Sequence, residues 1–167
     1  MMRSFRYVCL SACSFALLAL TLAASASARE ARLLRYPSIH HDFVVFAYAG
    51  DLWRAPSAGG HAFRLTSHEG VELTPKISPD GQWVAYPDND NELWLLNVAS
   101  KEQRRLSSNR EGAGDVAWSP DSRWLVFTQA AVNSYQQLLL HDVAGGTTTP
   151  LTSDRVNSWN AAWSPDG

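Results

Sequence analysis

The sequence predicts an all-β fold made of repeated units, each with four short antiparallel strands. A Ser-Pro-Asp unit occurs three times, at residues 78–80, 119–121 and 164–166. A Leu-Thr-Ser or Leu-Ser-Ser triplet begins 13 residues before each of these units, at Leu65, Leu106 and Leu151. Short aliphatic and aromatic runs bounded by Gly, Pro, Asn or Asp flank the units, and such runs are typical of strands.

The Ser-Pro-Asp unit has the composition of a type I turn. Such a turn favours Ser at its first position, Pro at its second and Gly at its fourth, as in Ser78-Pro79-Asp80-Gly81. We therefore expect it to join two antiparallel strands. The second of these strands is expected at Gln82 to Tyr86 and at Arg123 to Phe127, and a third strand at Glu92 to Leu96. No segment after residue 30 sustains a helical period. A repeat of about 40–45 residues with four strands has the size and content of a β-propeller blade.

A second motif recurs once in each repeat, and its spacing shows that the third repeat is longer than the second. Asp51-Leu52-Trp53, Glu92-Leu93-Trp94 and Gln137-Leu138-Leu139 are separated by 41 and then 45 residues. The four extra residues lie between Thr128 and Tyr135. Since packed strands of a repeat keep their length while connections vary, the pattern predicts a longer loop there.

The repeats predict a partial propeller over residues 29–167. Its blades are expected at about 33–66, 71–108 and 113–153, and a fourth begins at 158–167, so the propeller is incomplete and Trp163 is left partly exposed. In the first blade, Pro37 to Asp42 takes the place of the Ser-Pro-Asp turn, and Phe43 to Phe46 is the strand after it.

Tight hairpins with positive φ are expected near the end of two repeats. Gly59-Gly60 and Gly145-Gly146 each lie five residues before the closing leucine, and the middle repeat has Ser100-Lys101 at this place.

Residues 1–28 are predicted to be a secretory signal peptide. Arg3 and Arg6 precede the uncharged segment Tyr7 to Ala24, and Ala26-Ser27-Ala28 provides a site for cleavage. The sequence therefore indicates a periplasmic or secreted protein. A retained membrane anchor is the alternative, although the fully apolar part is short. Leu10 to Cys13 resembles a lipoprotein box, but most of the apolar region follows it rather than precedes it.

Cleavage would change both the cysteine content and the charge of the chain. Cys9 and Cys13 would be removed, so the mature part would have no disulfide. Without Arg3 and Arg6, 12 basic residues remain against 16 acidic residues, a net charge of −4. This balance disfavours nucleic acid and an anionic membrane surface as partners.

The sequence offers no catalytic, cofactor-binding or metal-binding residue. Asp88 to Glu92 has alternating oxygen ligands like a calcium loop, but Leu93 and Ala99 stand where that loop needs Gly and Glu, so a polar hairpin is expected. His40-His41-Asp42, beside Ser38, contains the residue types of a catalytic triad. Neighbours in one turn point in different directions, so we expect a turn at the edge of a blade.

The tryptophans suggest either a platform for sugar or peptide binding or the packing of blades on one another. Because most of them occupy equivalent strand positions in the repeats, packing is expected. They are Trp83, Trp94, Trp118, Trp124 and Trp163.

These motifs resemble the WD40-like repeats of the TolB and tricorn propellers. The opening is similar to the start of tricorn-type peptidases in the segments Arg35 to His40, Phe43 to Phe46, Gly50 to Trp53, Gly59-Gly60 and Arg64 to His68. The resemblance extends over residues 33–167 and is strongest over 35–86, while the middle repeat departs from it by lacking the Gly-Gly turn.

The resemblance implies the N-terminal propeller of an exported serine peptidase of the carboxy-terminal-processing class. In that class the propeller filters or channels peptides or unfolded polypeptide to a C-terminal catalytic core, usually with a PDZ module, and we expect the full-length parent to form a homo-oligomer. The core would lie beyond this sequence, so the chain alone is expected to be inert, with no cofactor.

Two other readings remain open. A TolB-like periplasmic propeller would act only through protein contacts, but it would carry an α/β domain before the propeller. Here the first repeat begins at about Leu33, shortly after the predicted cleavage site. The propeller of a dipeptidyl-peptidase-type α/β-hydrolase has the right domain order, although no G-x-S-x-G motif occurs in the sequence.

Overall fold

The computed structural model describes residues 33–67, 70–107, 112–131, 133–153 and 155–167. The chain divides into two units, Met1–Arg32 and Leu33–Gly167, and the described residues all belong to the second. The predicted signal peptide at residues 1–28 lies outside the described residues. Within the described ranges, no helix is long and apolar enough to cross a membrane.

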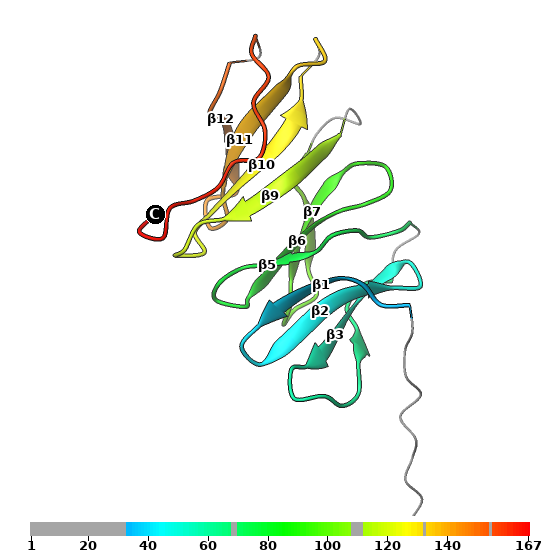
Figure 1. Cartoon of the computed structure of the whole chain (residues 1–167). Helices are drawn as coiled ribbons and strands as arrows, with labels where there is room; N and C mark the ends of the chain where they lie inside the picture. Colours follow the sequence, from blue (N-terminus) through cyan, green and yellow to red (C-terminus); the bar gives the residue numbers. More distant parts are fainter. Residues whose placement is uncertain (1–32, 68–69, 108–111, 132, 154) are drawn as a thin grey trace, which may run out of the picture. The chain divides into compact units, whose positions relative to one another are not determined.

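In the described ranges, twelve strands form three sheets of four, in which strands that follow one another in the chain pair antiparallel (Figure 1). The first sheet contains β1 (Arg35–His40), β2 (Phe43–Tyr48), β3 (Asp51–Pro56) and β4 (Phe63–Arg64). The second contains β5 (Lys76–Ile77), β6 (Trp83–Pro87), β7 (Leu93–Asn97) and β8 (Gln103–Arg105). The third contains β9 (Ala113–Trp118), β10 (Trp124–Ala130), β11 (Gln136–Asp142) and β12 (Thr147–Pro150). The predicted all-β fold of four-stranded antiparallel blades is confirmed.

Side chains of the Ser-Pro-Asp units close the turns between the first and second strands. Ser78 Oγ donates to Asp80 Oδ1 at 2.6 Å and accepts from the Trp83 amide at 3.0 Å. The third sheet repeats both bonds at 2.5 and 2.8 Å, with the residues that lie 41 positions later. Gly81 ends the turn with a φ of +72°, a conformation in which glycine has no steric penalty.

A hydroxyl group near the end of each repeat binds the start of the third strand. The Leu52 amide donates to Thr66 Oγ1 at 2.8 Å. The equivalent bonds join the Leu93 amide to Ser107 Oγ at 2.8 Å and the Leu138 amide to Thr152 Oγ1 at 3.0 Å. The repeated Leu-Thr-Ser triplet therefore has a structural cause, because its second residue supplies this hydroxyl.

The middle sheet is buried on both faces, since its alternate side chains pack against different neighbours. Val84 and Tyr86 lie in one apolar cluster with Val45 of the first sheet. Ala85 lies in a second cluster with Leu125 of the third sheet. This two-sided burial explains why β6 reads as a continuous apolar run rather than an alternating one.

The three closing leucines are equivalent in their backbone contacts but not in their exposure. Their amides donate to the carbonyls of Leu52, Leu93 and Leu138, at 2.8 Å in every case. Leu65 is 7% exposed, whereas Leu151 is 55% exposed. The difference follows from position, because among the described residues no further sheet follows the third one.

The turn of the first sheet is shorter than the sequence suggested. β1 continues through His40, which pairs with Phe43, so the turn consists of His41 and Asp42 alone. The expectation that Pro37 to Asp42 replaces the turn was wrong. Residues 37–40 remain in the strand because they pair with β2 as far as His40.

The extra residues of the third repeat lengthen strands, not a loop. β10 and β11 have 7 residues each, against 5 in β6 and 5 in β7, and the connection between the strands has the same length in both sheets. The prediction of a longer loop was therefore wrong. Two residues added to each arm preserve the alternation of side chains, and they form the additional pairs Gln129 with Gln137 and Ala130 with Gln136.

Positive φ occurs near the end of all three repeats. Gly59, Gly60 and Gly146 have φ of +89°, +129° and +69°. In the middle repeat Lys101 takes a φ of +62°, and its amide donates to Asn97 O as the Gly146 amide donates to Asp142 O. A tight turn is thus kept where glycine is missing.

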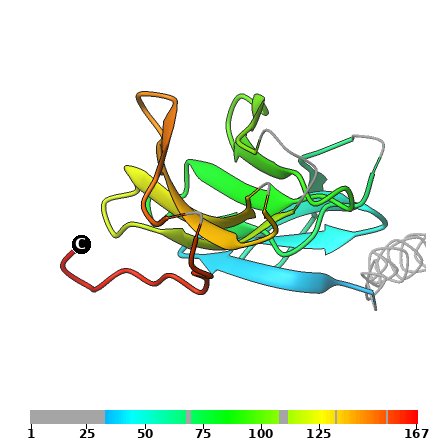
Figure 2. The same ribbon diagram turned by 90° about the horizontal axis from the view of Figure 1, so that it is seen from above.

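The chain after β12 passes back beside β9 (Figure 1), and Figure 2 shows the same course from above. Trp163 Nε1 donates to Ala117 O at 3.2 Å, which fixes the segment to the third sheet. Residues 158–163 form no strand, and Trp163 is partly exposed as expected.

Candidate functional site

At or just before the first strand of each sheet, the chain contains one residue more than the partner segment it faces. Between two successive pairs with the second strand, the first strand advances by one extra position, which is a β-bulge. In the first sheet the bulge lies between the pairs Arg35–Ala47 and Ser38–Val45. In the second sheet it lies between Glu72–Asp88 and Lys76–Ala85. In the third sheet it lies between Gly114–Thr128 and Ala117–Val126.

At each bulge one residue other than glycine has a positive φ. The residues are Tyr36, Thr74 and Asp115, with φ of +52°, +31° and +47°. Asn160, with φ of +54°, is the equivalent residue after the third sheet, since it lies four positions before Ser164 as Thr74 lies before Ser78. This conformation is costly for most side chains and least so for Asn and Asp. A strained position repeated in every unit marks these residues as candidates for function.

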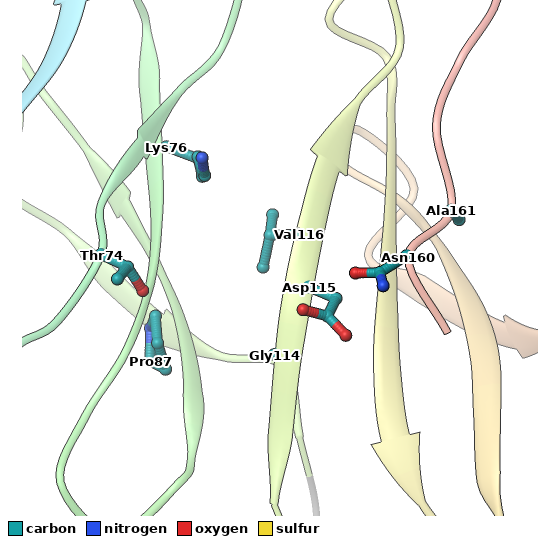
Figure 3. Close-up of a pocket in the computed structure, with 8 residues that line it drawn as sticks. All are labelled: Thr74, Lys76, Pro87, Gly114, Asp115, Val116, Asn160 and Ala161. Carbon is teal, nitrogen blue, oxygen red and sulfur yellow. The ribbon is translucent and has the colours of Figure 1, made fainter. Parts of the chain in front are cut away.

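Thr74, Asp115 and their sequence equivalent Asn160 line one pocket of about 390 Å³ (Figure 3). The second sheet supplies Lys76 from β5 and Pro87 from β6, and the segment just before β5 supplies Thr74. Strand β9 supplies Gly114, Asp115 and Val116. Asn160 and Ala161 complete the lining. In Figure 3 the polar ends of Asp115 and Asn160 point toward each other, and Thr74 and Lys76 lie on the other side of the pocket. Three consecutive repeats thus contribute equivalent residues to one site.

The pocket carries one positive and one negative side chain. Lys76 and Asp115 are both exposed, and neither forms an ion pair with another described residue. Thr128 Oγ1 donates to Asp115 Oδ2 over 3.5 Å, a long contact that leaves the carboxylate open to a ligand. The pocket can therefore bind a polar group of either charge.

Asp88 to Glu92 forms the predicted polar hairpin between β6 and β7. Asp88 Oδ1 accepts from the amides of Asp90 and Glu92 at 3.0 and 2.9 Å, and Asp88 Oδ2 accepts from Trp94 Nε1 at 2.9 Å. Across the part of the chain that the structure describes, no group of three His, Cys, Asp or Glu side chains could hold a metal ion.

Ser38 and His40 serve the packing of the first sheet on the second. Ser38 Oγ accepts from the Ile77 amide at 3.1 Å, and His40 Nε2 lies 3.1 Å from Pro79 O. His41 and Asp42 form the adjacent turn. The structure therefore does not assemble a triad from these residues.

Four of the five tryptophans make packing contacts or hydrogen bonds to a neighbouring repeat or apolar cluster, as their repeat positions suggested, whereas Trp124 lies under the Arg123 guanidinium of its own repeat. Trp83, Trp94 and Trp118 lie against the apolar clusters. Trp118 Nε1 donates to Lys76 O of the second sheet at 3.0 Å, a bond equivalent to that between Trp163 and Ala117. The indole before a Ser-Pro-Asp unit thus joins its repeat to the preceding one.

Tyr86 is a buried phenol rather than a reactive one. Its hydroxyl donates to Gln103 Oε1 at 2.9 Å. Burial, together with the negative charges of Glu72 and Asp88, raises its pKa far above its ordinary value of 10.0. Tyr86 therefore remains protonated at neutral pH and acts as a hydrogen-bond donor.

Sequence reasoning missed the residues that line the pocket. The available signal was the recurrence of Thr74, Asp115 and Asn160 four positions before each Ser-Pro-Asp unit. Without the strand register, these polar residues look like ordinary residues at the start of a strand.

Comparison with known proteins agrees with this geometry. Residues 31–92 match the family described as the tricorn protease N-terminal beta propeller domain. Tricorn protease homolog 1 of Streptomyces coelicolor is 31% identical over 125 residues, which cover 70% of this chain and 12% of that protein. The chain thus spans about an eighth of the length of this relative.

Solved structures share the fold. A structure of the tricorn protease has a TM-score of 0.66 at 15% identity, covering 74% of this chain and 13% of that one. A structure of putative TolB from Agrobacterium tumefaciens has a TM-score of 0.66 at 21% identity, covering 81% of this chain and 51% of that one. Over residues 31–92 the chain is thus similar to the tricorn protease N-terminal β-propeller family, and the following sheets have the same propeller fold.

Proposed function

We propose that this chain is the polypeptide-binding propeller region of an exported serine peptidase of the tricorn type. The main support for this proposal is the pocket near the start of consecutive repeats. There Thr74, Asp115 and Asn160 present polar groups to one cavity. Such a surface can hold the backbone and end groups of an extended chain. The sequence relationship to a tricorn protease homolog supports the peptidase context.

The catalytic core, the exported location and the oligomeric state belong to this proposal. The core would lie in a part of a longer protein outside this sequence, and the propeller would admit peptides or unfolded polypeptide to it. The segment Tyr7 to Ala24, with Arg3 and Arg6 before it, supports export to the periplasm or the medium. The longer protein would assemble as a homo-oligomer.

A TolB-like interaction protein is the second candidate function. It is favoured by the structural likeness to a putative TolB, of which the chain covers 51%. In that case the propeller would bind a folded protein partner and no enzyme would be attached. The two candidates differ in what the propeller binds.

The test measures both hydrolysis and binding by the purified chain. Fluorescently labelled peptides without stable structure are titrated with the chain, and their polarization and integrity are followed. We expect saturable binding and no cleavage, because the catalytic core is proposed to lie outside this sequence. A specific peptidase activity that stays constant through successive purification steps would contradict the proposal. Absence of peptide binding, with capture of a folded periplasmic protein, would favour the TolB-like function.

A further inference from the structure

We propose that the pocket lined by Thr74, Lys76, Asp115 and Asn160 binds the free amino terminus of a peptide. This inference rests on the proposed function and adds the chemical group that is recognised. It identifies Asp115 as the residue that determines specificity.

Three residues with positive φ supply hydrogen-bond acceptors that match an ammonium group. An ammonium group has three N–H donors. The Asp115 carboxylate, the Asn160 side-chain oxygen and the Thr74 hydroxyl are three acceptors around one pocket, and each comes from a different repeat. Asp115 also supplies the negative charge, and its contact with Thr128 is only a long one of 3.5 Å. A charged acceptor strengthens a hydrogen bond to a cation roughly twofold over a neutral one.

The other side of the pocket suits the rest of a peptide end. Lys76 can donate to the first peptide carbonyl, and no described residue forms an ion pair with it. Pro87, Val116 and Ala161 offer apolar contact for the first side chain. A volume of about 390 Å³ lies within the range of known ligand pockets and accommodates the first residues of a chain.

Backbone strain holds the acceptors in place. The φ of Asp115 is +47°, and this residue lies at the bulge between β9 and β10. Asn160 has a φ of +54° and lies three residues before Trp163, whose indole donates to Ala117 O of β9. Asn and Asp adopt this conformation at the lowest cost among residues with a side chain. Asp115→Asn therefore removes the charge while it leaves the bulge intact, and it separates a binding effect from a folding effect.

The experiment is an NMR titration of the purified chain with three unstructured peptides of one sequence. The first has a free amino terminus and no lysine, the second is N-acetylated, and the third is N-acetylated with one internal lysine. We expect the first peptide to shift the amide signals of Gly114, Asp115 and Val116. The second peptide should bind at least about tenfold more weakly, since a charged hydrogen-bonded pair is lost. The third peptide shows whether a lysine ammonium can replace the amino terminus.

Two charge-removing variants complete the test. Asp115→Asn should lower the affinity of the chain for the first peptide at least about tenfold. The variant should no longer bind the free peptide more tightly than the acetylated one. Asp90→Asn removes the same charge from the exposed hairpin between β6 and β7. This variant should change neither the affinity for the first peptide nor the preference for it over the acetylated peptide. Equal binding of free and acetylated peptides, unchanged in Asp115→Asn, would overturn the inference but leave polypeptide binding intact. Absence of binding by any peptide would overturn both the inference and the proposed function.

Discussion

Removal of one hydroxyl from equivalent positions in two sheets should cost unequal free energies of unfolding. Thr66→Val and Thr152→Val are the same nearly isosteric change, and each removes the acceptor for one leucine amide. Thr66 is 2% exposed and the Leu52 that it binds is 0% exposed, so that amide would stay buried without a partner. Thr152 and Leu138 are only half-buried, so we expect water to replace the hydroxyl at the Leu138 amide.

The expected magnitudes follow from this difference in burial. An unsatisfied buried amide costs about 1–3 kcal/mol, whereas a hydrogen bond exchanged for one with water costs about 0.5–1.5 kcal/mol. We expect Thr66→Val to lower the free energy of unfolding by about 2 kcal/mol and Thr152→Val by about 0.5 kcal/mol. At a denaturant slope of about 1.5 kcal/mol/M in urea, the Thr66→Val midpoint falls by about 1.3 M.

Urea unfolding followed by tryptophan fluorescence measures both variants. The slope should be unchanged, so that the shift in midpoint reports stability alone. Thr66→Ser is the control, since it keeps the hydroxyl and should retain most of the stability. Equal losses in the two valine variants, or a larger loss in Thr152→Val, would refute the assignment of this hydroxyl as the closing bond of each repeat.

Three further predictions concern backbone strain and pH. Gly81→Ala should lower the free energy of unfolding by more than 2 kcal/mol, because φ is +72° and a Cβ would lie 2.8 Å from His40 Cε1. Gly146 has a φ of +69° and open space around the added Cβ, so Gly146→Ala should lower the free energy of unfolding by only about 1 kcal/mol of backbone strain. Urea unfolding compares the two alanine variants. Lys101→Gly should raise stability by about 0.5 kcal/mol in the same assay, since φ is +62° there, and a loss of stability would show that the lysine side chain matters more than the strain. Burial lowers the pKa of His141 below its ordinary value of 6.5, so the unfolded chain takes up this proton more readily and stability should fall as the pH drops through 6.5. The urea midpoint at pH 7.5 and 5.5 measures this fall, and His141→Gln should reduce it; an unchanged fall would assign it to other groups.

Turn chemistry was the part of the fold that the sequence predicted best. The Ser-Pro-Asp unit predicts its turn because Ser78 and Asp80 act locally on the backbone within five residues. The spacing of the closing leucines predicted the four-stranded sheets because a repeated contact requires a repeated distance along the chain. These features depend on residues near one another in sequence.

The features that sequence reasoning missed depend on pairing between strands. An insertion in the third repeat looks like a longer loop until the register shows Gln129 opposite Gln137. In the same way, Asp115 and Asn160 do not appear as partners, because a bulge shifts the alternation of side chains and the pocket joins separate repeats. Register and contacts between repeats leave little trace in a single sequence.

The measurement that tests the central claim most directly is the location of a bound polypeptide on the propeller. An unstructured peptide with a nitroxide label near its amino terminus is added to the isotope-labelled chain, and paramagnetic broadening of the amide signals is recorded. The account predicts strong broadening at Gly114, Val116 and Ala161, which line the pocket, and little at the outer strands β4, β8 and β12. Broadening concentrated on the outer strands, with the pocket signals unchanged, would contradict it.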